Sequence, residues 1–249
     1  MIISKTNDYI KHIKSLSEKK YRDEYHEFII EGIKLVNEAI IEKANIKKII
    51  ICEELLKEKV ESENVEYVSE TVFRHISETQ NPQGILAVVE QKTSEKEYGK
   101  TIFALDNLRD PGNLGTIIRT LDSAGISSLI LSKGSADLYN PKVIRSTMGA
   151  IFRIKIIECE DLTKTLKEIR KHKFKLVVTS LQTDKSLYDI NFDKKVIVIG
   201  NEANGVSKDI QDLSDEKIKI PMIGKTESLN ASVATGVVLY EYVRQKLSK

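Results

Sequence analysis

Short apolar runs and amphipathic helical patterns alternate along residues 100–249. Runs of Val, Ile and Leu that end at Gly, Pro or charged residues predict β-strands at residues 101–105, 128–131, 152–157, 175–180, 196–199 and 218–220. Apolar positions at helical spacing predict helices between them, at residues 114–124, 141–148, 162–171, 206–213 and 230–247. This alternation favours an α/β fold with helices on both faces of a mostly parallel sheet.

The first part of the chain shows the same patterns in a shorter, separate set. Strands are predicted at residues 27–32, 47–52, 65–68 and 85–89, and helices at residues 10–16, 33–42, 53–62 and 69–76. A polar, highly charged stretch follows them. We therefore expect a small α/β/α domain at residues 1–92, a linker at 93–99 and a larger domain at 100–249.

Three of the predicted strands run directly into polar loops that contain glycine. These loops begin after residues 105, 199 and 220, and they carry Asn, Glu, Ser and Arg side chains. Loops at the carboxyl edge of an α/β sheet form the usual ligand crevice. Ordinary strand-to-helix turns are the alternative, but three such loops with these side chains favour a site.

Neither of two common nucleotide motifs is complete in these loops. The first loop has only Gly112 and Gly115, which does not make the Rossmann pattern of three glycines. The second has Gly200 and Gly205 at P-loop spacing, but Val206 stands where the phosphate-binding Lys is required. The crevice therefore suits a bulky, mostly uncharged ligand such as an adenosine better than a triphosphate.

Composition narrows the class of protein. Of 249 residues 41% are hydrophobic, the net charge is +2, and the two Cys and four His show no metal-ligand spacing. We expect no metal site, no disulfide, no signal peptide or membrane span, and a cytoplasmic location.

Basic side chains are concentrated near the N-terminus, where only Asp8 and Glu18 oppose them within residues 1–22. A solvated helix face is one interpretation of this run, and a surface that contacts RNA phosphates is the other. The candidate RNA contacts are Lys11, Lys14, Lys19, Lys20 and Arg22.

The three loops carry a family resemblance. Residues 110–120 read D-P-G-N-L-G-T-I-I-R-T, residues 199–207 read I-G-N-E-A-N-G-V-S, and I-P-M at 220–222 precedes E-S-L-N-A-S-V-A at 227–234. In order and spacing, these blocks resemble the three motifs of the SpoU (TrmH) family of RNA ribose 2′-O-methyltransferases, within the SPOUT class. Residues 28–39 and 81–87 are similar to the family's small L30e-like RNA-binding domain, so the resemblance covers nearly the whole chain.

The resemblance implies several properties that periodicity does not give. The C-terminal domain is expected to contain a deep trefoil knot, to bind S-adenosyl-L-methionine in the knotted loops, and to form a homodimer with the active site at the subunit interface. The implied cofactor contacts are Thr179, Gly200, Ile220, Met222 and Leu229.

The resemblance also assigns candidate catalytic residues, namely Arg119, Asn113, Glu202, Ser228 and Asn230. A ribose hydroxyl is a poor nucleophile, so its proton must be withdrawn or its oxyanion stabilised. Arg119 suits charge stabilisation, with a surface ion pair as the alternative. Ser228 and Asn230 have a second interpretation as caps of the last helix.

The helix at residues 141–148 adds one further candidate RNA contact. In the family this region lies near the site, which makes Arg145 a candidate for binding a phosphate; a structural ion pair is the alternative.

The resemblance thus implies an RNA ribose 2′-O-methyltransferase, with 23S ribosomal RNA as the favoured substrate. Three alternatives stay open: a transfer RNA enzyme, a resistance-type ribosomal RNA enzyme, and a non-catalytic RNA-binding protein that keeps the knot.

Overall fold

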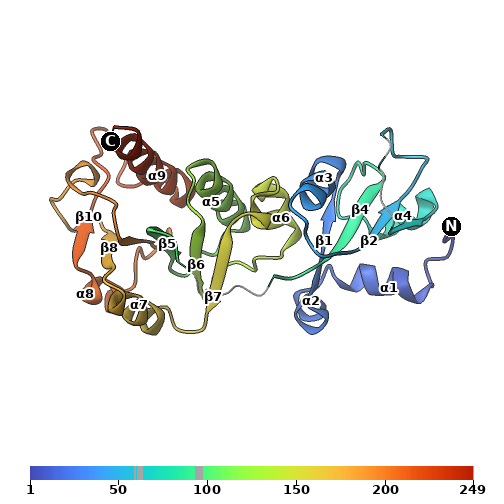
Figure 1. Ribbon diagram of the computed structural model, residues 1–249, viewed down its shortest axis with the longest axis horizontal. Helices are drawn as coiled ribbons and strands as arrows, with labels where there is room; N and C mark the ends of the chain where they lie inside the picture. The colour runs from blue at the N-terminus through green and yellow to red at the C-terminus, as the bar shows by residue number, and fades with distance from the viewer. Residues whose placement is uncertain (59, 61–63, 93–97, 249) are drawn as a thin grey trace. The chain divides into compact units, whose positions relative to one another are not determined.

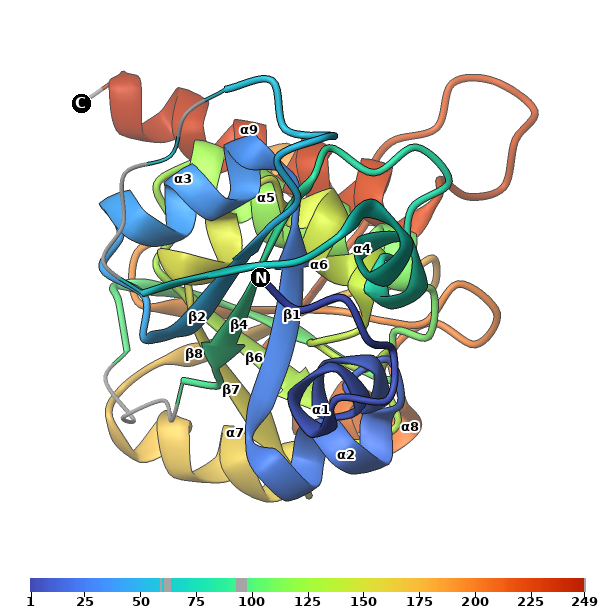
Figure 2. The same ribbon diagram turned by 90° about the vertical axis from the view of Figure 1, so that its right-hand side faces the viewer.

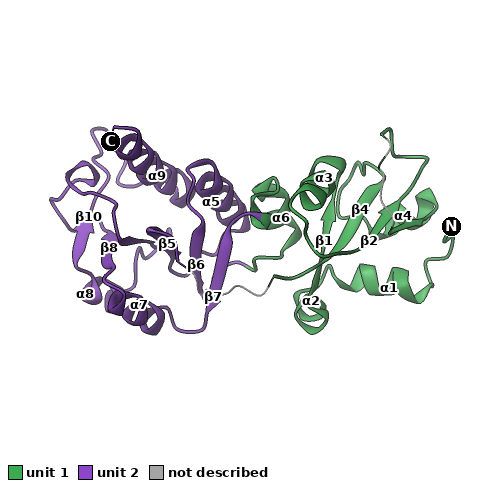
Figure 3. Cartoon of the chain, viewed as in Figure 1, with its two compact units in different colours: residues 1–93, 137–152 green, residues 94–136, 153–249 purple. Residues whose placement is uncertain are grey.

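The computed structural model describes the whole chain except residues 59, 61–63, 93–97 and 249. Its contacts divide the chain into two compact units (Figure 3). The first unit contains residues 1–93 and 137–152, and the second contains residues 94–136 and 153–249. Residues 137–152 belong to the first unit by their contacts, although by sequence they lie inside the predicted C-terminal domain.

The first unit is built on a four-stranded mixed sheet. Its order is β1 (Glu27–Glu31), β4 (Ile85–Glu90), β2 (Ile46–Ile51) and β3 (Val65–Tyr67). Strand β4 is antiparallel to both β1 and β2, and β3 pairs in parallel with β2. The two central strands are mostly buried because their Ile, Val and Leu side chains face packed layers.

The α-helices that the structure describes in this unit are α1 (Asp8–Ser15), α2 (Lys19–Tyr25), α3 (Ile33–Ile41), α4 (Glu70–Ile76) and α6 (Pro141–Thr147). Helices α1 and α4 place Ile10, Ile13, Phe73 and Ile76 in one buried cluster against the sheet. Asn7 caps α1 by accepting hydrogen bonds from the amides of Tyr9 and Ile10.

The second unit contains a six-stranded sheet in which every pairing is parallel. Its order is β10 (Glu216–Ile218), β8 (Lys175–Thr179), β9 (Lys195–Ile199), β5 (Thr101–Leu105), β6 (Ser128–Ser132) and β7 (Lys155–Cys159). The central strands β5 and β9 are buried along their whole length, as expected for a parallel sheet covered on both faces.

Helices cover both faces of this sheet (Figures 1 and 2). Helices α5 (Pro111–Ser123) and α9 (Ala231–Leu247) pack together on one face, and α7 (Leu162–Lys171) and α8 (Lys208–Leu213) cover the other. The α/β fold with a parallel sheet is therefore confirmed. In the described part of the chain, no helix has the length and apolar content needed to cross a membrane.

Two local predictions from the sequence were wrong. The strand expected at residues 152–157 is Lys155–Cys159, because residues 150–152 form a buried 3₁₀ turn after Met148, which has a positive φ of 50°. The helix expected at residues 53–62 is not formed at residues 53–58, where turns follow β2; the rest of that span lies largely outside the described residues. The backbone of Gly84 packs against that of residues 55 and 56, which fixes these turns.

Candidate active site

The carboxyl ends of β5 and β9 are tied together by one side chain that follows each strand, Asp106 after β5 and Asn201 after β9. The Asp106 carboxylate accepts a hydrogen bond from the Ser207 amide at 2.7 Å, and the Asn201 side-chain amide donates to the Asn107 carbonyl oxygen at 2.8 Å. Asn107 has a positive φ of 56°, which asparagine tolerates better than most residues. These three residues hold the loop after β9 against the start of the first loop.

The loop after β9 turns back tightly on itself. The amides of Asn201 and Gly205 each donate to the other residue's carbonyl oxygen, at 3.1 and 2.8 Å. Gly200 lies so close to the far side of this turn that a Cβ atom on it would be 2.0 Å from the Gly205 carbonyl carbon. Glycine is therefore required at position 200 by the close approach of two backbone segments.

A pocket opens between this loop, the end of β8 and the segment that connects β10 to α9. All five residues that the resemblance implies as cofactor contacts line it, namely Thr179, Gly200, Ile220, Met222 and Leu229. Its walls also include the buried apolar side chains of Ile199 and Ile218. The two segments that the resemblance places in a knot thus share one cavity with mostly apolar and backbone walls.

A polar network joins three of the five candidate catalytic residues. The Asn113 side-chain amide donates to Glu202 at 2.5 Å, and the Asn230 amide donates to the Asn113 side-chain oxygen at 3.1 Å. The three residues come from the first turn of α5, the loop after β9 and the start of α9, and Glu202 also lines the pocket. All three residues are at least partly exposed, so the network is open to a ligand.

Asn230 and Ser228 have different roles at the start of α9. Asn230 caps α9, accepting hydrogen bonds from the amides of Ser232 and Val233 at 3.0 and 3.4 Å, while its own side-chain amide reaches Asn113. Ser228 is exposed at the pocket wall and does not cap the helix. Asn230 therefore has the capping role and a place in the polar network together.

Arg119 lies outside this network. It is exposed on α5 and, among the described residues, forms neither an ion pair nor a hydrogen bond through its side chain. Asn113 pairs with Glu202 and Asn230. The guanidinium group is thus available to a ligand.

The candidate RNA contacts of the first unit differ in their surroundings. Lys11, Lys14 and Lys19 form ion pairs with Asp8, Glu78 and Asp23, and the Lys20 ammonium lies 5.4 Å from the centre of the Tyr21 ring.

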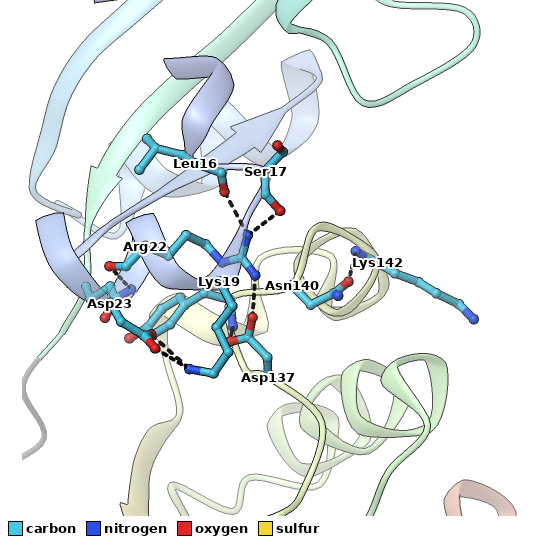
Figure 4. A network of polar contacts seen from close by, with 10 residues as sticks. Leu16, Ser17, Lys19, Arg22, Asp23, Asp137, Asn140 and Lys142 are labelled. Carbon is cyan, nitrogen blue, oxygen red and sulfur yellow. Dashed lines mark hydrogen bonds and ion pairs between the residues drawn. The ribbon is translucent and has the colours of Figure 1, made fainter. Parts of the chain in front are cut away.

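Arg22 is buried, with only 3% of its surface exposed, and it pairs with Asp137 (Figure 4). It is therefore closed to a ligand, unlike Arg145, which is exposed on α6.

Sequence reasoning did not single out Asp106, Asn107 and Asn201 as separate contributors to the site. Their position was the available signal, since polar residues directly after two neighbouring parallel strands meet at one sheet edge. In the described residues, no group of three or more His, Cys, Asp or Glu side chains is placed to bind a metal ion.

Comparison with known proteins identifies the family of the chain. Residues 100–240 match the family model of the SpoU rRNA methylase family, and residues 7–87 match that of the MRM3-like substrate binding domain. The chain belongs to the SpoU rRNA methylase family. It is 33% identical over 242 residues to the 23S rRNA (guanosine(2553)-2′-O)-methyltransferase RlmP of Bacillus subtilis, covering 96% of this chain and 97% of the relative.

Solved structures of SpoU enzymes share the fold. An AdoMet-bound rRNA methyltransferase from Sinorhizobium meliloti superposes with a TM-score of 0.84 at 33% identity, covering 98% of this chain and 97% of the other. The SpoU methyltransferase AviRb from Streptomyces viridochromogenes, in complex with AdoMet, gives a TM-score of 0.85 at 25% identity over 97% and 99% of the two chains.

Proposed function

We propose that this protein is an S-adenosylmethionine-dependent RNA methyltransferase that modifies a ribose 2′-hydroxyl, with 23S ribosomal RNA as its substrate. The observation that carries the proposal is the convergence of the three sequence blocks at one place. One pocket and one polar network contain nine of the ten candidate cofactor and catalytic residues that the family resemblance assigns, and only Arg119 stands apart.

The pocket fits the cofactor by its chemistry. Apolar side chains and backbone atoms form most of its wall, which suits a neutral adenosine, and Ile220, Met222 and Leu229 are partly buried there. S-adenosylmethionine, when bound, supplies a methyl group activated by its sulfonium. Gly200 permits the close backbone approach that shapes this wall of the pocket.

The chain's own residues then position and activate the acceptor. Asn113 and Asn230 hold the Glu202 carboxylate at the edge of the pocket, where it orients the ribose or accepts the hydroxyl proton. Ser228, exposed at the same wall, is placed to hydrogen-bond the ribose. Arg119 binds the adjacent phosphate and stabilises negative charge that develops on the attacking oxygen.

We further infer that the protein works as a homodimer in the cytoplasm. The large apolar side chains of Val233 and Tyr240 on α9 are 52% and 55% exposed, and burial against a second copy would account for this exposure. Light scattering after size exclusion tests this directly. The dimer predicts twice the 28.2 kDa mass of the chain, and a single-chain mass at assay concentrations would refute it.

The deciding experiment is mass spectrometry of nucleosides from RNA incubated with the purified protein and methyl-labelled S-adenosylmethionine. Ribosomal and transfer RNA are treated separately, with Arg119→Ala as the matched inactive control. A labelled 2′-O-methyl nucleoside in 23S rRNA is expected. Label in transfer RNA, in another ribosomal nucleotide typical of resistance, or in no pool at all would redirect the function to the corresponding alternative.

A further inference from the structure

Helix α6 presents two neighbouring basic side chains on the surface of the first unit. Lys142 and Arg145 are three positions apart, so they lie on the same side of the helix. Both are exposed, and neither forms an ion pair with another described residue. They differ in this respect from Lys11, Lys14 and Lys19, whose charges are balanced by nearby carboxylates.

The start of α6 is held by Arg22. The Arg22 guanidinium donates to the carbonyl oxygens of Leu16 and Ser17, both at 2.7 Å, and to the carboxylate of Asp137 (Figure 4). The other carboxylate oxygen of Asp137 accepts from the Tyr139 amide at 3.2 Å.

Asp137 then leads directly into the helix cap. Its carbonyl oxygen accepts from the Asn140 amide at 3.1 Å, and Asn140 caps α6 through the Lys142 amide at 2.9 Å. Arg22 thus fixes the turn from which the helix starts, while the Lys142 side chain extends away from this network (Figure 4).

The other end of the segment is also fixed within the first unit. Gly149 has a positive φ of 93°, and a Cβ atom on it would lie 2.8 Å from Cγ of Glu38 in α3. The Lys92 ammonium donates to the Phe152 carbonyl oxygen at 2.5 Å. Because the end at residues 149–152 stays fixed, loss of the contacts at the Asp137 end is expected to change the direction of α6.

The Arg22–Asp137 pair is poorly suited to contribute stability alone. Nε of Arg22 is buried without a hydrogen-bond partner, and burying a charged pair costs much of what its attraction returns. The Arg22 guanidinium makes three directed hydrogen bonds to two chain segments, and such a planar group is well suited to fixing the orientation of one segment relative to the other. The burial of Arg22 also excludes it from direct contact with a phosphate.

We propose that Arg22 is a positioning residue for RNA recognition: through Asp137 it holds α6 so that Lys142 and Arg145 together bind RNA phosphates. The proposal rests on the proposed RNA methyltransferase function and adds a phosphate-binding surface to it. Arg22 itself touches no RNA.

The test compares variants that change charge in opposite directions. RNA affinity is measured against salt concentration for Arg22→Met, Arg22→Lys and Asp137→Asn, with Lys142→Ala/Arg145→Ala as the reference. Each phosphate contact contributes about 0.7–0.9 to the slope of log affinity against log salt, so losing both lowers the slope by about 1.5. All four proteins are expected to show this loss, and adding Asp137→Asn to the reference is expected to change the slope no further.

Other outcomes would overturn the proposal. A direct phosphate contact by Arg22 predicts that Arg22→Lys keeps the slope and that Asp137→Asn leaves RNA affinity unchanged or raises it. A purely structural pair predicts lower thermal stability with an unchanged slope in every folded variant. If Arg22→Met does not fold, the salt dependence of Asp137→Asn and Arg22→Lys still distinguishes these outcomes.

Measurements on the wild-type protein show whether the proposed RNA methyltransferase function itself is wrong. In that case the wild-type protein would neither bind RNA nor transfer label to it. S-adenosylmethionine affinity, measured by calorimetry, is expected to be unchanged in all variants, because the cofactor pocket lies in residues of the second unit.

Discussion

Adding one methyl group at Gly200 is expected to open the loop that shapes the proposed cofactor pocket. In Gly200→Ala the new Cβ atom would lie 2.0 Å from the carbonyl carbon of Gly205 and 2.1 Å from the amide nitrogen of Val206. Ordinary contacts begin at 3.4 Å, so the turn must move by about 1.4 Å. Both obstructing atoms are backbone, and no side chain can rotate to relieve the overlap.

The size of the effect follows from the bonds that this movement breaks. The two hydrogen bonds between Asn201 and Gly205 would be lost, at about 0.5–1.5 kcal/mol each, so the free energy of unfolding falls by about 1–3 kcal/mol. Because the loop also forms the pocket wall, S-adenosylmethionine affinity should fall at least about tenfold, or about 1.4 kcal/mol. Urea unfolding and calorimetric titration measure the two quantities.

Gly224→Ala provides the matched control. Gly224 lies in the segment between β10 and α9, but a Cβ atom there meets nothing within 4 Å. The same substitution should leave stability within about 0.5 kcal/mol of the wild type and the cofactor affinity unchanged. If Gly200→Ala behaves like Gly224→Ala in both measurements, the steric argument for position 200 is wrong.

Three further predictions concern other parts of the molecule. Asn230→Ala removes the cap of α9 and should lower the unfolding free energy by about 1 kcal/mol in urea, whereas Ser228→Ala, which removes no cap, should leave stability unchanged and lower turnover. Arg119→Ala should reduce kcat about 10²–10³-fold in a methyl-transfer assay with unchanged S-adenosylmethionine affinity by calorimetry; retained turnover would remove Arg119 from the mechanism. Burial, together with the hydrogen bond to Glu54, raises the pKa of the Cys52 thiol from 9.0 to about 11. The contribution of the raised Cys52 pKa to the free energy of unfolding is complete below pH 9 and is lost as the pH rises from 9 to 11. Because the thiol is buried and protonated, native Cys52 should resist alkylation at pH 8, and rapid labelling of the folded protein would contradict this.

The parallel sheet and the meeting of the polar loops at one sheet edge were predictable because both depend on local pattern. Buried strands such as 101–105 and 196–199 read as continuous apolar runs, and their ends lie on the same sheet edge once the strands are parallel. The polar residues that follow those strands therefore meet without any further information. The strand order, which places β8 between β10 and β9, depends on long-range pairing and was not predicted.

Other features could not be read from local pattern because they are set by distant partners. Turns follow β2 in place of the predicted helix, because the backbone of residues 55 and 56 packs closely against the backbone of Gly84. The apolar residues 150–152 resemble the start of a strand, but they are buried by a 3₁₀ turn in the first unit. In both places the local propensity is overridden by tertiary contact.

The basic residues show most clearly what sequence leaves open. Arg22 and the lysines of α1 and α2 form one cationic run in the sequence, yet Arg22 is buried against Asp137, and Lys11, Lys14 and Lys19 are balanced by carboxylates. A paired lysine must give up its carboxylate before it gains a phosphate, so its net contribution to RNA binding is small. Lys142 and Arg145 have no carboxylate partner among the described residues and can therefore bind a phosphate without first breaking an ion pair. The salt dependence of RNA binding should therefore follow α6 more closely than the N-terminal run whose sequence first indicated an RNA surface.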